Sequence, residues 1–388
     1  MLSKKVQEME PQIIAWRRHL HAAPELSFQE FHTTAFLAEE LKKIPGLKLS
    51  FPTKTGVVAT LKGACPGPII ALRADIDALP ITEETGLPFA SGTPGVMHAC
   101  GHDGHVAMQL AAAALLAPMK EQLCGEVRFL FQHAEELPPG GAAEMAAAGV
   151  MEGVSEVYGL HLSSSFPTGT FGVRAGALTS ATDRFDIKII GKGGHSAFPE
   201  TCIDPIVTAA QVISALQTVV SRKIRAVEPA VVSVCMIQAG QAYNIIPGDV
   251  SLTGSTRTFD KDTRRSLPLV LEQLVRGTCD ANGAAYAFRF TPGYASVFND
   301  KALTQVGRQV IQDTFGDRAV LEIDPLMPGE DFSAFLDFCP GFFVELGARN
   351  EETGCTVAHH NSRYLMDEKA LAYGTEYLFR LVCSRLSF

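Results

Sequence analysis

The sequence predicts an α/β protein whose larger domain has a mixed, largely parallel sheet with helices on both faces. A smaller α+β domain is inserted into it. Two observations predict this fold. Strand-like apolar runs alternate with helical patterns from near Ile13 to about Ser180, which is the order found in parallel sheets covered by helices. The pattern then changes near Arg184 and returns to strand–helix alternation after Pro292. The predicted domains are residues 1–181 with 294–388, and residues 182–293.

The larger domain should contain three strands before the insertion, each an apolar run that ends in polar residues. The expected strands are 68–72, 127–131 and 157–160. Residues 106–116 are apolar nearly all round, which is typical of a helix packed deep against a sheet. After the insertion we expect a helix at 303–315, a strand at 342–346 and a helix at 368–386.

The inserted domain should have two helices covering one face of a four-stranded sheet. Its first helix has clear start signals, because Asp204 is suited to the N-cap and Pro205 to the first turn. The second helix is expected at 261–276. The expected strands are 185–190, 230–237, 249–258 and 285–290.

Composition excludes several classes of function. The 388 residues include 42 acidic and 33 basic side chains, and the resulting net charge of -9 offers no broad basic surface for nucleic acid. No apolar segment approaches the roughly 20 residues that span a bilayer, and the N-terminus lacks a secretory pattern, so we expect a cytoplasmic protein without a membrane partner. The nine cysteines show no framework spacing. We expect packing or surface thiols, apart from Cys100.

Candidate catalytic residues follow the predicted strands. The segments 73–77, 132–136 and the residue His161 each come directly after an apolar run. Because ligands and catalytic groups collect at the carboxyl ends of strands in open α/β sheets, we expect these segments to form one site.

A metal site is the simplest interpretation of residues 97–105, which contain one cysteine and three histidines. The Cys100–His102 spacing alone is a weak signal, since neighbouring histidines also cap helices or hydrogen-bond within loops. The adjacent Glu135 and Glu136 strengthen it, because one carboxylate can bind metal while the other accepts a proton from water.

Nine segments of the sequence match the pattern of one known family. They are 17–30, 73–91, 97–105, 131–136, 159–162, 191–199, 244–248, 327–333 and 359–361. Each segment is modest alone, but together they are specific. Through them the sequence resembles the M20 metallopeptidases, specifically the amidohydrolase branch with hippurate hydrolases, aminoacylases and indole-acetyl-amino-acid hydrolases. The resemblance covers essentially the whole chain.

The resemblance implies a set of roles for the larger domain. Glu135 would be the general base, and Asp77 would orient a ligand imidazole such as His102. His360 is chosen over His359 from the family pattern, since side-chain alternation alone leaves the two open. The implied ligands of two divalent metal ions are Cys100, His102, Glu136, His161 and His360.

The resemblance also implies that the inserted domain is a ferredoxin-like lid and dimerisation domain. His195 would donate to the oxyanion in the partner subunit's site, although a turn histidine is the alternative. Asn244 and Arg257 would hold the substrate carboxylate, against the alternative of an exposed strand charge at Arg257. Gly329 would allow close backbone approach near the acyl pocket. We therefore expect a homodimer or tetramer.

The expected activity is hydrolysis of N-acyl amino acids, such as N-acetyl or N-benzoyl derivatives, using zinc or manganese. Cobalt and nickel also suit these ligands. A metallo-dipeptidase of the same superfamily is the first alternative, because both reactions hydrolyse an amide beside a carboxylate. A cysteine-nucleophile amidase based on Cys100 and a non-catalytic binding protein are the others.

Overall fold

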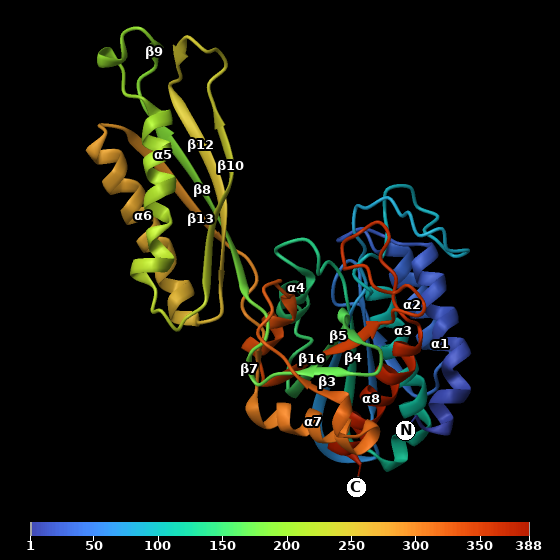
Figure 1. The fold of residues 1–388 in the computed structure, drawn as a ribbon. Coiled ribbons are helices and arrows are strands. Elements are labelled where there is room, and N and C mark those ends of the chain that lie inside the picture. Colours follow the sequence, from blue (N-terminus) through green and yellow to red (C-terminus); the bar gives the residue numbers. More distant parts are fainter. Residues whose placement is uncertain (1, 388) are drawn as a thin grey trace. The chain divides into compact units, whose positions relative to one another are not determined.

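The computed structural model describes residues 2–387, which form two compact units (Figure 1). The large unit contains the residues up to Leu178, Val297–Pro325 and the residues from Asp331 onward. The inserted unit contains Thr179–Ser296 and Leu326–Glu330. The chain therefore enters and leaves the inserted unit more than once.

The large unit is built on an eight-stranded sheet with the order β1-β2-β4-β3-β5-β16-β6-β15. The four neighbouring strands β4, β3, β5 and β16 are mutually parallel, whereas β1, β2 and the β16–β6 pairing are antiparallel. The carboxyl ends of the four parallel strands therefore lie at one edge of the sheet. The strands are β1 (Leu47–Ser50), β2 (Val57–Lys62), β3 (Cys65–Asp75), β4 (Cys124–Gln132), β5 (Val154–Pro167), β6 (Phe171–Val173), β15 (Val320–Glu322) and β16 (Gly341–Arg349). A short separate pair joins β7 (Gly176–Ala177) to β14 (Phe298–Asn299).

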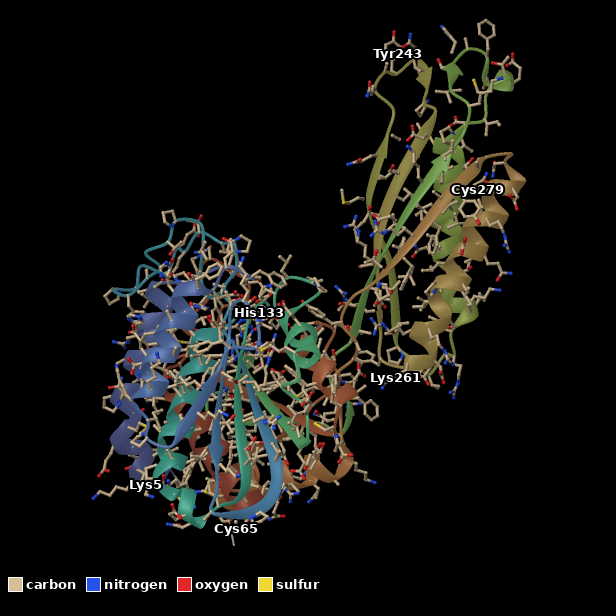
Figure 2. The ribbon with its side chains drawn as sticks, turned by 180° about the vertical axis from the view of Figure 1, so that it is seen from behind. Lys5, Cys65, His133, Tyr243, Lys261 and Cys279 are labelled. Atoms are coloured by element: carbon tan, nitrogen blue, oxygen red, sulfur yellow. A yellow bond between two sulfur atoms is a disulfide. The ribbon has the colours of Figure 1, made fainter. Side chains whose placement is uncertain are left out.

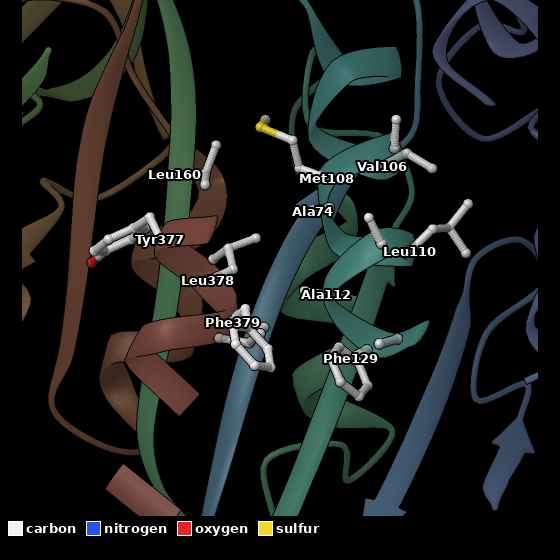
Figure 3. Packing of buried hydrophobic residues seen from close by; sticks show 14 of the residues in the cluster. Ala74, Val106, Met108, Leu110, Ala112, Phe129, Leu160, Tyr377, Leu378 and Phe379 are labelled. Atoms are coloured by element: carbon white, nitrogen blue, oxygen red, sulfur yellow. The ribbon is translucent and has the colours of Figure 1, made fainter. Parts of the chain in front are cut away.

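Helices cover both faces of this sheet, which confirms the predicted fold class. On one face, side chains of α3 and α8 meet the strands, as Figure 3 shows for Met108, Phe129 and Phe379. On the other face, Met145 of α4 and Phe332 pack against the sheet. The helices are α1 (Lys4–Ala22), α2 (Phe31–Lys42), α3 (His102–Leu116), α4 (Gly141–Ala147), α7 (Lys301–Phe315) and α8 (Lys369–Leu386).

Helix α3 is buried along almost its whole length, as its uniformly apolar sequence predicts. It starts at His102, four residues before the predicted start, because Gly101 takes a left-handed φ of 92° and turns the chain into the helix. Within residues 2–387, no helix is long and apolar enough to cross a membrane.

The inserted unit has the βαββαβ order of a ferredoxin-like fold, with a four-stranded antiparallel sheet in the order β10-β12-β8-β13. Asp204 caps the first helix by accepting the Ile206 and Val207 backbone N–H groups, as predicted. The elements are β8 (Ala181–Ile190), β9 (Gly194–His195), α5 (Pro205–Leu216), β10 (Ala230–Ala239), β11 (Ile245–Ile246), β12 (Asp249–Thr258), α6 (Lys261–Ala281) and β13 (Ala285–Pro292).

The structure corrects the expectation for two cysteines, because Cys65 and Cys124 form a disulfide. The two residues are direct partners on the parallel strands β3 and β4, with Cα atoms 4.6 Å apart. Their separation of 59 residues hides this proximity in the sequence. Figure 2 shows Cys65 at the end of the sheet opposite His133, which follows β4. The remaining seven cysteines are free thiols.

Candidate metal centre

The five predicted ligands lie together in the large unit. Donor atoms of Cys100, His102 and His161 lie within 4.8 Å of one another, and so do those of Cys100, Glu136 and His360. Cys100 belongs to both groups. The arrangement has the form of two adjacent ion sites that share one sulfur ligand.

His102 is oriented for binding by the segment that follows β3. Its Nδ1–H donates to the backbone carbonyl of Asp77 at 3.0 Å and to the Asp77 Oδ1 at 3.2 Å. Its Nε2 is buried and makes no hydrogen bond in the structure. A histidine that donates one N–H to a carboxylate and leaves its other ring nitrogen unpaired among further donor atoms has the form of a metal ligand.

His161 is held in the same way by its own strand. Its Nδ1–H donates to the Leu162 carbonyl at 2.7 Å, and its Nε2 lies 3.4 Å from the Cys100 Sγ. The predicted strand end before His161 is wrong, because β5 continues to Pro167. The pairing of β3 with β5 stops at Arg73 and Gly159, so His161 lies just beyond the paired part of β3, while on its other side it pairs with Glu345 of β16.

His105 lies close to these ligands, but its hydrogen bonds stabilise the fold. Its Nδ1–H donates to Asp75 Oδ1 at 2.6 Å, and its Nε2 accepts the Leu162 backbone N–H at 2.8 Å. Both ring nitrogens are therefore occupied. The structure leaves His105 no lone pair for an ion.

The structure separates the adjacent residues His359 and His360. The His360 Nε2 lies 3.3 Å from Glu136 Oε1, within the donor group that includes Cys100. The His359 ring instead packs against Tyr364, with a centroid distance of 4.7 Å. His360 has a left-handed φ of 61°, and this backbone conformation turns the two rings in different directions.

The site favours a positive charge at its centre. Burial opposes charging of His102, yet the carboxylates of Asp75 and Asp77 raise its pKa to about 10. Burial, followed by the carboxylates of Glu136 and Glu135, raises the pKa of the Cys100 thiol. A buried cluster of side chains that stabilises a proton on imidazole and disfavours thiolate is one that a divalent cation would balance. The donor set of one sulfur, three imidazoles and carboxylate suits such an ion.

A buried polar network supports the sheet edge beneath the site, and sequence reasoning missed it. Arg73 donates to Gln132 Oε1, Asp75 Oδ2 and Asp331 Oδ1, each at 2.7 Å. Asp331 also accepts the Ala142 backbone N–H at 3.0 Å. Asp331 lies 258 residues from Arg73 in the chain, so no local pattern in the sequence indicates this contact. The network ties the ends of β3 and β4 together.

The candidate residues of the inserted unit fall into two groups. His195 and Asn244 are neighbours, because β9 pairs with β11 and the Ser196 N–H donates to the Asn244 carbonyl at 3.1 Å. Arg257 lies at the other end of β12, opposite Thr182. Gly329 lies beside that same residue, and a Cβ at Gly329 would come within 2.5 Å of Thr182 Cγ2.

The two groups are separated by the length of a strand. Figure 2 shows Tyr243 and Lys261 at opposite ends of the inserted unit, next to Asn244 and close to Arg257 respectively. β12 has 10 residues, and a strand of that length spans about 33 Å. One small molecule therefore cannot contact both groups of a single chain.

Comparison with known proteins identifies the family of this chain. The model of the peptidase family M20/M25/M40 matches residues 71–384. The chain belongs to this family. The match includes all five candidate ligands together with Asp77 and Glu135, but it begins after Ser27, whose hydroxyl donates to Asp77 Oδ2 at 2.7 Å.

Relatives of this M20 chain hydrolyse amides. It is 52% identical to an N-acyl-L-amino acid amidohydrolase of Geobacillus stearothermophilus over 298 residues, which cover 77% of this chain and 80% of that protein. It is 42% identical to an N-acetylcysteine deacetylase of Bacillus subtilis (strain 168), covering 95% of each. The M20 chain is thus an amidohydrolase, an enzyme that cleaves amide bonds.

The fold of the M20 chain also matches solved structures. One is the YXEP protein of Bacillus subtilis, described as a dinuclear metal binding peptidase from the M20 family. It is 38% identical in sequence with a TM-score of 0.86, and the match covers 97% of this chain and 98% of that one.

Proposed function

We propose that this amidohydrolase removes the acyl group from N-acyl amino acids, such as N-acetyl or N-benzoyl derivatives, and releases a carboxylate and the free amino acid. The observation that carries the proposal is the pair of donor groups sharing Cys100, with Glu135 next to the ligand Glu136. The names of the relatives in Geobacillus and Bacillus support this substrate class.

Two divalent ions are the proposed cofactors, with zinc or manganese as the first choice and cobalt or nickel as other suitable ions. One would be held by Cys100, His102 and His161, and the other by Cys100, Glu136 and His360. Such ions lower the pKa of a water molecule to about 7 and polarise an amide carbonyl. The unpaired Nε2 of His102 is the clearest sign that the residues fit an ion.

Glu135 is the proposed general base. It is buried with 7% of its surface exposed, and one of its oxygens lies within 4.8 Å of donor atoms of His102 and Glu136. From this place Glu135 takes a proton from the attacking water and returns it to the leaving amine nitrogen. Asp77 holds His102 in the tautomer whose Nε2 is free to bind.

The inserted unit supplies the proposed polar contacts to substrate. The His195 Nδ1 accepts the Ala197 backbone N–H at 3.1 Å, so the proton of the neutral ring lies on Nε2 and can be donated to an oxyanion. Among residues 2–387 no carboxylate forms an ion pair with Arg257, whose guanidinium fork matches a substrate carboxylate. Gly329 is proposed to line the acyl pocket.

A homodimer is proposed because these residues lie toward opposite ends of β12. If Arg257 and His195 contact the same substrate, they must come from different subunits, because one molecule cannot reach both ends of the unit. Each site would then combine Arg257 of one chain with His195 and Asn244 of the other. Exposed apolar side chains on α5, such as Ile206 and Val207, offer area for such an interface.

The cysteine-nucleophile alternative conflicts with the electrostatics of the site. A reactive cysteine needs a depressed pKa, usually from a nearby cation. Burial and the carboxylates of Glu136 and Glu135 instead raise the pKa of Cys100. The dipeptidase alternative uses the same catalytic groups and differs only in the acyl part of the substrate.

The test is hydrolysis of a panel of N-acetyl amino acids, N-benzoyl amino acids and dipeptides by metal-reconstituted protein. We expect turnover of the acyl derivatives, a fall in kcat of about 100- to 10,000-fold for Glu135→Gln, and loss of activity on chelation. Glu144→Gln, a half-exposed carboxylate paired with His133, is the matched control that should keep activity. Turnover of dipeptides alone would favour the dipeptidase, and turnover that survives chelation would contradict the metal mechanism.

A further inference from the structure

Two buried carboxylates hold the backbone on either side of Glu135. The Ala134 backbone N–H donates to Glu30 Oε1 at 2.8 Å, and the Glu136 backbone N–H donates to Asp77 Oδ2 at 3.0 Å. The proposed base is therefore the central residue of a three-residue segment whose outer amides are both fixed. Glu30 comes from the connection between α1 and α2, over 100 residues earlier in the chain.

The backbone of this segment needs such support. Ala134 has a φ of 51°, in the left-handed region that residues other than glycine rarely adopt. Phe28 has a φ of 65°, and its N–H donates to the same Glu30 oxygen at 3.0 Å. Left-handed residues of this kind persist only where surrounding contacts determine them. Glu30 thus joins two strained turns through one oxygen atom.

Glu30 has no exposed surface and is satisfied entirely by hydrogen bonds. Its second oxygen, Oε2, accepts the Thr55 hydroxyl at 2.9 Å. Burial raises the pKa of Glu30, and the neighbouring Asp77 raises it further. A carboxylate in such a place is costly to the fold, so a role in holding the Ala134 amide explains its presence better than stability does.

We propose that Glu30 is a positioning residue for catalysis, which sets the direction of the Glu135 carboxylate by fixing the Ala134 amide. The inference rests on the proposed role of Glu135 as base. The decisive property of Glu30 is a side chain long enough to place an acceptor oxygen within hydrogen-bond distance of the Ala134 N–H. The negative charge of Glu30 is secondary. Displacing a catalytic group by about 1 Å can cost about 100-fold in rate.

Two substitutions separate the effect of side-chain length from the effect of charge at position 30. Glu30→Gln keeps an oxygen at the position of Oε1 and lets its amide donate to Thr55, but removes the charge. Glu30→Asp keeps the charge and shortens the side chain by one methylene. We expect kcat within about 3-fold of wild type for Gln and a fall of about 100-fold for Asp, with KM and bound metal little changed.

Hydrogen exchange of the segment 132–137 gives a readout that needs no substrate. We expect the Ala134 amide to be protected in the wild type and in Glu30→Gln, and to exchange faster in Glu30→Asp. Thr55→Val is the matched control, because it removes a partner of the other Glu30 oxygen and should change neither kcat nor the exchange of this segment.

A higher kcat for Glu30→Asp than for Glu30→Gln would overturn the proposal, since charge would then be the decisive property of this residue. Equal exchange in both variants would overturn it as well. If the wild type turned over no amide, the proposed function would fail instead, and the exchange pattern would still report whether Glu30 holds the Ala134 amide.

Discussion

The two sheets of this protein distribute their candidate residues differently. In the large unit, residues from β3, β5 and the segment after β4 meet, because parallel strands end at the same edge. In the inserted unit the strands are antiparallel, and Arg257 lies near the carboxyl end of β12, whereas Asn244 precedes β11 and lies near the other end. Motif residues on a parallel sheet therefore assemble one site, whereas those on an antiparallel sheet can serve two.

The largest expected effect concerns the site of the large unit, where the adjacent residues His359 and His360 are compared. His360→Ala should remove a proposed ligand of the ion that Glu136 would also bind. It should lower kcat by more than the roughly 100-fold that is typical when a residue supporting a metal ligand is lost. Elemental analysis should show fewer bound ions. The adjacent His359→Ala should keep both metal and most activity, because its ring packs on Tyr364. The reverse result would assign the ligand to His359.

Mixing subunits tests the proposal that His195 and Arg257 of one chain serve two different sites. His195→Ala and Arg257→Ala should each lower kcat/KM by about 100-fold, through loss of an oxyanion donor and of carboxylate binding. Coexpression of the two variants should restore about a quarter of wild-type activity, because half of the dimers are mixed and one of their two sites is intact. Absence of recovery would contradict a site shared between subunits.

A control for this experiment pairs His195→Ala with the double variant that also carries Arg257→Ala. No dimer of that mixture has a site with a histidine at position 195, so activity should stay low. Recovery in this control would show that the assay detects something other than shared sites.

The smallest expected effect concerns a residue of the inserted unit that has no proposed contact with substrate. Asp260 caps α6 by accepting the Thr263 N–H at 2.7 Å, and Asp260→Ala should cost about 1 kcal/mol of stability with kcat unchanged. The backbone hydrogen bond lowers the Asp260 pKa. This stabilisation is therefore complete above the ordinary pKa of an aspartate and declines as pH falls through the lowered value.

Thermal unfolding between pH 7 and pH 3 measures this difference. The gap between wild type and Asp260→Ala should narrow at the acid end. Asp262→Ala, an exposed carboxylate in the same first turn, is the control and should show a smaller gap at every pH.

Local signals in the sequence predicted much of the fold. Asp204 starts α5, and the strand expected at 249–258 is β12 with the same limits. Alternation and capping are properties of neighbouring residues, so they can be read without the fold. The strand end before His161 was misplaced, because a strand can continue past the end of its neighbour.

The missing information is long-range. Neither the disulfide between Cys65 and Cys124 nor the contact of Asp331 with Arg73 has a local pattern, because each depends on which strands and loops become neighbours. For His359 and His360, alternation predicts that the side chains diverge but not which one faces Glu136. The left-handed φ of His360 decides this direction.

The connection between α1 and α2 has a consequence for any shortened form of the enzyme. Ser27 and Glu30 touch Asp77 and Ala134, yet both precede the span 71–384 that matches the family model. A fragment trimmed to that span would keep every proposed ligand, the base and Asp77, but it would lose the hydrogen bonds that Ser27 and Glu30 make to Asp77 and Ala134. Such a fragment should be a poor enzyme even if it folded, so the N-terminal helices belong to the minimal catalytic portion of the chain.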